Sequence, residues 1–270
     1  MSRASPRMPV YYIPHGAGPC FFMDWNPPDT WDRMAAFLRG LRTRLPARPR
    51  AIVVVSAHWL APQFRLTGHA RPPLIYDYYG FPPHTYELTY PAPGHPALAE
   101  QAAKLLEQRG LEAAVDPHRG LDHGAFIPLK LMFPQADVPV IQLSLRRDLA
   151  PRIHLDAGRA LASLRDKGVL IVGSGMSFHN MRGYGDPRYT PVSAAFDTWL
   201  TAAVESPPPE RDFLLEHWAR APQAQLCHPP GAEEHLVPLL VAAGAAGDCA
   251  GERVYSERIL ETTISAYRFG

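Results

Sequence analysis

The sequence predicts an α/β fold, a three-layer α/β/α sandwich whose central sheet is mixed but mainly parallel. One observation is the alternation along the chain between short β-branched runs and stretches in which apolar residues recur at helical spacing. Another is the composition of the runs YYI, AIVVV and VLIVG, which is typical of strands buried on both faces of a parallel sheet. Because such strands are joined by helical crossovers, we expect helices on both faces of the sheet.

The individual elements follow from these patterns. Strands are expected within four apolar segments, residues 9–16, 48–59, 138–145 and 168–175. Helices are expected where the apolar spacing is helical, in residues 29–45, 95–110, 125–134, 150–167, 193–206, 210–222 and 233–246. Asp29 or Thr30 is the expected N-cap of the first helix, and Gly110 is the expected C-cap of the second. Residues 74–93 are rich in aromatic residues and proline, so we expect a loop with one or two short strands.

The composition indicates a single globular domain spanning residues 1–270. Hydrophobic residues make up 46% and charged residues 20%, and the 30 prolines fall between periodic segments rather than in a linker. The formal net charge of +1 gives no reason to expect nucleic acid or an anionic membrane as a partner. No apolar run approaches the roughly 20 residues of a membrane span. The first residues lack the apolar segment of a signal peptide, so a cytoplasmic location is expected.

Cysteine chemistry and the common catalytic motifs are not indicated. The 3 cysteines include no CxxC pair, which argues against a disulfide framework, and Cys20 is expected to be a small buried hydrophobe. No G-x-G-x-x-G follows the first strand, and neither a phosphate-binding P-loop nor HExxH occurs. The segment GSGMS does not meet the G-x-S-x-G pattern of serine hydrolases.

Five histidines stand apart because each lies where a strand appears to run into a loop or beside a turn. They are His15, His58, His123, His179 and His235. Ligands of open α/β sheets bind beyond the carboxyl ends of the strands, and neutral imidazole is the commonest metal ligand. The sequence therefore predicts a metal site there, with the carboxylate of Asp122 orienting the ring of His123. The other histidines weighed are expected to be packed or surface residues: His69, His84, His95, His118, His154 and His217.

Longer motifs surround these histidines, namely HGAGP, VVSAHW, IYDYYGFPPHTYELTYPAPG, GLDHGAFIPLKLMFPQADVPVIQLSL, VLIVGSGMSFHNMR and HPPGAEEHLVPLLVAAGAAGD. Together they resemble the class III extradiol ring-cleavage dioxygenases, and most closely the DOPA extradiol dioxygenase-like branch. The similarity extends from about Pro9 to the C-terminal SAYRF. It implies an α/β fold, a mononuclear non-haem Fe(II) and the insertion of both atoms of O₂ into a catechol ring. Structures of the branch commonly hold Zn(II) at the same position.

The resemblance also implies roles for the five histidines. His15, His58 and His235 match the metal ligands, and His235 stands where better-known relatives have a glutamate. His179 matches a pocket histidine that serves either as a fourth ligand or as an acid/base. His123 matches a second pocket histidine that assists proton transfer.

Two positions depart from the usual family motifs. The segment HGAGP lacks the hydroxyl that usually stands beside the first ligand. The bulky Phe178 next to His179 is expected to alter the preferred substrate shape.

Two other functions remain open from the residues. One is a zinc-dependent hydrolase in which Asp122 or Glu234 acts as the base, and the other is a non-catalytic binding protein on the same fold. For the dioxygenase, the expected partners are a catechol-type small molecule and O₂, with no nucleic acid and no membrane. DOPA, caffeate-like and protocatechuate-like catechols are not ranked by the sequence, and no oligomeric state is predicted.

Overall fold

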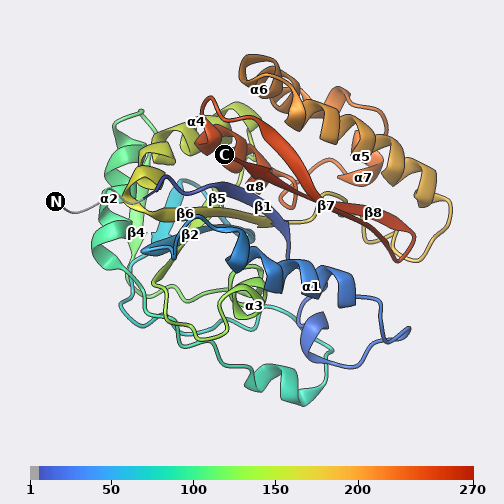
Figure 1. The fold of residues 1–270 in the computed structure, drawn as a ribbon, viewed down its shortest axis with the longest axis horizontal. Helices are drawn as coiled ribbons and strands as arrows, with labels where there is room; N and C mark the ends of the chain where they lie inside the picture. Colours follow the sequence, from blue (N-terminus) through green and yellow to red (C-terminus); the bar gives the residue numbers. More distant parts are fainter. Residues whose placement is uncertain (1–5) are drawn as a thin grey trace.

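An eight-stranded mixed sheet forms the middle layer of the molecule in the computed structural model, which describes residues 6–270 (Figure 1). The strands lie in the order β4-β3-β5-β2-β6-β1-β8-β7. Their bounds are β1 (Val10–Pro14), β2 (Ala51–Ala61), β3 (Phe64–Thr67), β4 (Ala113–Asp116), β5 (Val140–Arg146), β6 (Val169–Gly175), β7 (Gly251–Ile259) and β8 (Thr262–Phe269). The central pairs β1–β6, β6–β2 and β2–β5 are parallel, whereas β8 joins β1 in antiparallel orientation.

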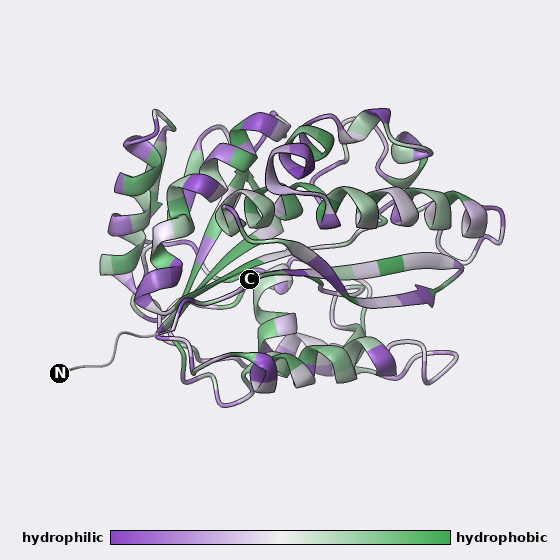
Figure 2. Ribbon diagram, turned by 45° about the horizontal axis from the view of Figure 1, so that its top comes forward, coloured by the Kyte–Doolittle hydropathy of each residue, from purple (hydrophilic) through white to green (hydrophobic). Residues whose placement is uncertain are grey.

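Helices cover both faces of this sheet. Their bounds are α1 (Asp32–Leu41), α2 (Pro96–Glu107), α3 (His123–Met132), α4 (Pro151–Leu161), α5 (Tyr189–Glu205), α6 (Pro208–Glu216), α7 (Ala224–Cys227) and α8 (Val237–Ala246). Short 3₁₀ helices are η1 (Cys20–Phe22), η2 (Arg42–Arg44), η3 (Pro83–Glu87), η4 (Ala162–Lys167) and η5 (Trp218–Arg220). Figure 2 shows α1 and α3 on one face and the remaining helices on the other, which confirms the predicted three-layer sandwich.

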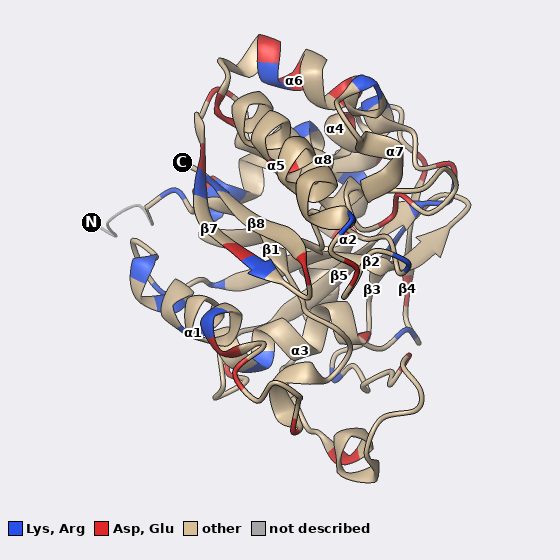
Figure 3. Ribbon diagram, turned by 90° about the vertical axis from the view of Figure 1, so that its right-hand side faces the viewer, with Lys and Arg blue, Asp and Glu red and all other residues tan. Residues whose placement is uncertain are grey.

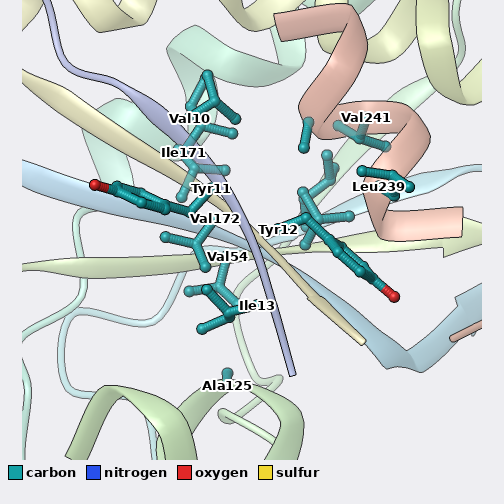
Figure 4. Packing of buried hydrophobic residues seen from close by; sticks show 14 of the residues in the cluster. Val10, Tyr11, Tyr12, Ile13, Val54, Ala125, Ile171, Val172, Leu239 and Val241 are labelled. Carbon is teal, nitrogen blue, oxygen red and sulfur yellow. The ribbon is translucent and has the colours of Figure 1, made fainter. Parts of the chain in front are cut away.

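The core lies on both sides of the central strands β1 and β6 because these strands are buried on both faces. Every residue of β1 and β6 is buried. Figure 4 shows Tyr12 of β1 on the side of Leu239 of α8 and the neighbouring Ile13 on the side of Ala125 of α3. All residues of α8 are buried, as expected for a helix that is apolar around its whole circumference. These central strands and α8 form the rigid base on which the candidate site is built.

The hairpin of β7 and β8 and the edge strands β3 and β4 were not expected from the sequence. The turn of the hairpin is made by Leu260 and Glu261, both at positive φ (46° and 67°). Hairpin turns of this kind usually carry Asn-Gly or Asp-Gly, and that signal is missing here. The short strands expected in residues 74–93 were wrong: within this stretch the structure has η3 and one isolated bridge from Leu74 to Leu121.

Both predicted helix caps were wrong. The N-cap of α1 is Trp31, and the Thr30 hydroxyl donates instead to the carbonyl of Pro27. The C-cap of α2 is Gln108, while Gly110 takes a φ of 72° in the turn that follows. In both cases the residue that was expected at the cap lies instead in the turn next to the helix.

Among the described residues, no helix combines the length and the apolar character needed to cross a membrane. Figure 3 shows acidic and basic residues close together along α1, α6 and the surface loops.

Candidate metal centre

The carboxyl ends of three neighbouring strands bring the first histidines together. His15 directly follows β1, and His179 lies in the loop that follows β6. His58 was expected just past its strand but lies inside β2, which continues to Ala61. The pairing of β2 with β6 ends at Ser56, and the register with β5 shifts after Val55. Because β2 leaves β6 at this point, the side chain of His58 is free to face the space between the strand ends.

His235 reaches the same place from the other side of the sheet. It was expected to begin a helix, but it lies in the turn just before α8. Its carbonyl accepts hydrogen bonds from the backbone N–H of Met176 (3.1 Å) and the hydroxyl of Tyr12 (2.8 Å). A Cβ on Gly175 would collide with this carbonyl, so the close approach requires glycine there. These contacts fix the position of the imidazole relative to the strand ends.

The rings of His15, His58 and His235 converge tightly enough to hold one ion. One nitrogen from each lies within 4.8 Å of the others, and the two Nε2 atoms of His15 and His58 are 3.3 Å apart. Two imidazole nitrogens bound tetrahedrally to one ion, each at about 2.0–2.1 Å, are separated by about 3.3–3.4 Å. The observed separation therefore matches that of two ligands of a common metal.

An unpaired nitrogen of the cluster supports the same conclusion. Nε2 of His235 is buried without a hydrogen-bond partner among the described residues. Leaving a buried polar atom unpaired costs about 1–3 kcal/mol, so such atoms call for a ligand. Nδ1 of His235 is bound to the Glu234 carboxylate at 2.9 Å, which leaves Nε2 as the atom available to a metal. The donor set fits a divalent transition metal.

Burial keeps the three rings neutral and able to bind a metal at pH 7. The pKa values of His15, His58 and His235 are lowered well below the usual value, chiefly by desolvation and further by neighbouring histidines. A metal ligand must be deprotonated, so these lowered pKa values reduce competition from protons.

His123 lies beside the three rings and is held by a different carboxylate from the one expected. Its ring is 3.8 Å from that of His58 between centroids. Its Nδ1 and its backbone N–H each lie 2.9 Å from Oδ1 of Asp77. Burial raises the pKa of Asp77, but the hydrogen bonds and charge of His123 outweigh that effect and lower it. Asp77 therefore orients the ring of His123, the role that was expected of Asp122 from the sequence.

Asp122 is instead a buried structural anchor. It is the N-cap of α3, and its carboxylate accepts hydrogen bonds from the hydroxyl of Ser56 (2.7 Å) and the side-chain amide of Gln142. The same Ser56 oxygen accepts from the backbone N–H of His58. Asp122 thus ties the start of α3 to the strand that carries His58. It is fully buried and does not line the cavity, so it is not placed to act as a base.

His179 stacks on His235 rather than joining the other two rings. The two ring centroids are 3.3 Å apart at an angle of 15°. Nδ1 of His179 lies 3.7 Å from Glu234, so these two residues and His235 form a second group of donor atoms. A third group is formed by His58, Asp77 and His123. Desolvation, with a contribution from His123, lowers the pKa of His179 to about 4.

A cavity of about 300 Å³ opens onto these rings, and all five histidines line it. Phe178 does not line it, contrary to the expected effect on substrate shape: its ring is buried against Tyr184 and Tyr189. Nδ1 of His15 has no hydrogen-bond partner among the described residues, and the HGAGP segment that begins with this histidine carries no hydroxyl side chain. The cavity gives a small molecule direct access to the cluster.

The other histidines do not join the cluster. His69, His84, His95, His118, His154 and His217 are outside every group of potential ligands found among the described residues. Cys20 is buried, as expected, and burial raises the pKa of its thiol. Sequence reasoning missed Asp77, which lies in the aromatic stretch interpreted as a loop. It also missed His228, a buried ring bonded to the carbonyl of Ser177 in the loop that carries His179.

The fold and this cluster define an α/β protein with a histidine-rich candidate metal centre at the strand ends. Comparisons with known proteins agree. The family described as the catalytic LigB subunit of aromatic ring-opening dioxygenase matches residues 9–269. The dioxygenase tasH of Hapsidospora irregularis is 40% identical over 99% of this chain and 88% of its own length. The 4,5-DOPA dioxygenase extradiol of Beta vulgaris is 40% identical, with 88% and 87% covered.

A solved structure agrees as well: an uncharacterized protein from Escherichia coli K12 superposes with a TM-score of 0.77 at 30% identity. The alignment covers 98% of this chain and 100% of that one. The chain belongs to the LigB family, and it is an extradiol aromatic ring-opening dioxygenase that depends on a metal and acts on an aromatic substrate and O₂. The zinc hydrolase and the non-catalytic binding protein are not favoured.

Proposed function

We propose that the protein cleaves a catechol ring beside its two hydroxyls with Fe(II) held by His15, His58 and His235. The observation that carries this proposal is the convergence of three neutral imidazoles at the base of a cavity, where Nε2 of His235 is buried without a hydrogen-bond partner among the described residues. Fe(II), when bound, supplies redox chemistry toward O₂ and Lewis acidity toward the catechol oxygens. Zn(II) suits the same three ligands and binds them more tightly, but it has no redox chemistry.

His123 is the proposed proton acceptor and donor. The Asp77 carboxylate accepts a hydrogen bond from Nδ1–H of His123, which fixes the tautomer and leaves Nε2 free to take a proton. The same carboxylate stabilises the imidazolium that results. A catechol hydroxyl placed in the cavity would give up its proton to Nε2, and His123 would return a proton later in the reaction.

His179 is proposed as a second acid/base rather than a fourth ligand. Its ring lies against the face of His235, in a donor group that lacks both His15 and His58. The ring of His179 also lines the cavity, where it can contact a bound substrate. Glu234 orients His235 and lies close to His179, which links the position of the acid/base to that of the ligand.

The substrate class is a catechol, either DOPA-like or a related aromatic diol, since several relatives are named 4,5-DOPA dioxygenase extradiol. The test compares the protein loaded anaerobically with Fe(II) and the same protein loaded with Zn(II). On mixing with a catechol and O₂, the iron form should consume one O₂ per catechol and form a yellow ring-opened semialdehyde. Equal O₂-dependent ring opening in an iron-free zinc form would refute the proposal.

A further inference from the structure

The wall of the cavity is apolar beyond the histidines. The side chains that form it come from the segment after β1, from the loops around Phe81 and Tyr184, and from the hairpin turn. They include Trp25, Trp31, Phe81, Met176, Met181 and Leu260. A volume of about 300 Å³ is at the small end for a ligand site, where about 300–1,000 Å³ is usual. The cavity therefore fits a single aromatic ring with a short substituent.

No lysine, arginine, aspartate or glutamate lines this cavity in the described part of the chain. Its polar side chains besides the histidines are the indoles of Trp25 and Trp31 and the phenol of Tyr184, all uncharged. The Tyr184 hydroxyl already donates to the carbonyl of Phe178 at 2.8 Å. Arg182, the neighbour of Met181 in the chain, does not line the cavity. Apart from the histidines and the metal that they would hold, a charged substituent would thus find no ionic partner there.

Burying an unpaired charge is far more costly than burying a neutral polar or apolar group. We propose that the substrate is a small catechol whose ring substituent is uncharged, in preference to a catechol carrying a carboxylate or an amino-acid group. This inference rests on the proposed function. Charged substituents are selected against by the apolar wall, which is formed by Trp25, Trp31, Phe81 and Met181.

The most direct test uses a matched pair of substrates, 3-(3,4-dihydroxyphenyl)propanoic acid and its methyl ester. They share the ring and the chain and differ in one negative charge. With the Fe(II)-loaded protein, kcat/KM for the ester should exceed that for the acid at least about tenfold, and L-DOPA should rank with the acid. The Zn(II)-loaded protein, which does not turn over, should bind the ester more tightly than the acid by calorimetry.

A cation introduced at the mouth of the cavity tests whether the lack of charged side chains in the wall causes the preference for uncharged substrates. Met181 lines the cavity and is 72% exposed, so a longer charged side chain is tolerated there. In Met181→Lys the ratio of kcat/KM for ester over acid should fall several-fold. Met181→Leu, the uncharged control, should keep the wild-type ratio. An unchanged ratio in Met181→Lys would overturn the assignment of the preference to charge.

The possible outcomes separate the two proposals. If neither the ester nor the acid is opened by the iron form, the proposed function itself fails. If both are opened and the acid or L-DOPA is preferred, the dioxygenase function stands and the uncharged-substrate inference is overturned. A preference for the ester in both turnover and zinc-form binding supports the inference.

Discussion

Helix α8 separates two buried polar clusters, which differ in whether their nitrogens have hydrogen-bond partners. Before its first turn lies the histidine cluster, where nitrogens of His15 and His235 are buried without a partner in the described part of the chain. At its last turn lies an arginine cluster, the buried guanidiniums of Arg165 and Arg211. Arg165 donates to the carbonyls of Met8, Ala245 and Ala246.

Arg211 completes the second cluster by donating to the carbonyls of Ala243, Gly247 and Cys249. Neither arginine has an unpaired side-chain nitrogen. A helix C-terminus leaves carbonyls unpaired and carries partial negative charge, which these cations neutralise. The difference indicates that the fully hydrogen-bonded arginine cluster stabilises the fold, whereas the histidine cluster is a site for a ligand.

The largest effect that follows is on metal binding. His15→Ala should remove most of the bound metal and lower kcat on the order of 10³-fold, since the metal supplies several kcal/mol to the transition state. The folded apo protein should be no less stable than wild type, because the substitution removes a buried nitrogen that lacks a partner. Elemental analysis and urea unfolding measure the two effects.

His154→Ala is the matched control for that variant. This ring is also buried, but both of its nitrogens are bonded, to the backbone of Arg146 and of Ala150. The control should keep its metal and lose stability. Full metal occupancy in His15→Ala would remove that residue from the ligands.

The arginine cluster should give the opposite result. Arg211→Met leaves three buried carbonyls without their donor, so the free energy of unfolding should fall by about 3 kcal/mol. The metal content per folded molecule should remain that of wild type. Arg152→Met, which breaks an exposed ion pair with Asp156 and Glu216, should cost less than about 1 kcal/mol. Loss of metal in Arg211→Met at full folding would contradict the division between the two clusters.

Within the histidine cluster, ligands and proton carriers should also separate. His123→Phe should lower kcat by about 10²-fold while the metal content stays unchanged. Asp77→Asn should lower kcat by about 10–100-fold, because the amide no longer fixes the tautomer of His123. Normal kcat per metal-loaded molecule in His123→Phe would leave proton transfer to His179 or to water.

The smallest expected effect is on the pH dependence of stability, and it comes from His154, a buried histidine whose two ring nitrogens are both hydrogen-bonded. Burial lowers the pKa of His154 to about 4, against about 6.5 in the unfolded chain. The unfolded chain then binds the extra proton first, so this contribution to stability is present above pH 6.5 and is lost as the pH falls toward 4. Between pH 7 and pH 5 the loss is about 2 kcal/mol. In His154→Gln, urea unfolding should show a pH dependence reduced by that amount.

Much of the fold and the histidine set could be predicted from the sequence, because both depend on local pattern. The runs around Val54 and Val172 are apolar enough to indicate buried parallel strands, and a histidine beside each strand end is visible in the sequence. The hairpin of β7 and β8 was missed, since its turn at Leu260 and Glu261 has no glycine or asparagine. Asp77 was missed because its contact with His123 joins segments 46 positions apart, which no spacing rule relates.

The central claim is that His15, His58 and His235 together hold one metal ion, and anomalous diffraction at the iron edge tests it most directly. Crystals loaded anaerobically with Fe(II) should show one peak, at about 2.0–2.2 Å from one nitrogen of each of these three rings. Two other donor groups lie close by, one with Asp77 and His123 and one with His179 and Glu234. A peak centred in either of those groups, and absent between the three rings, would contradict the account.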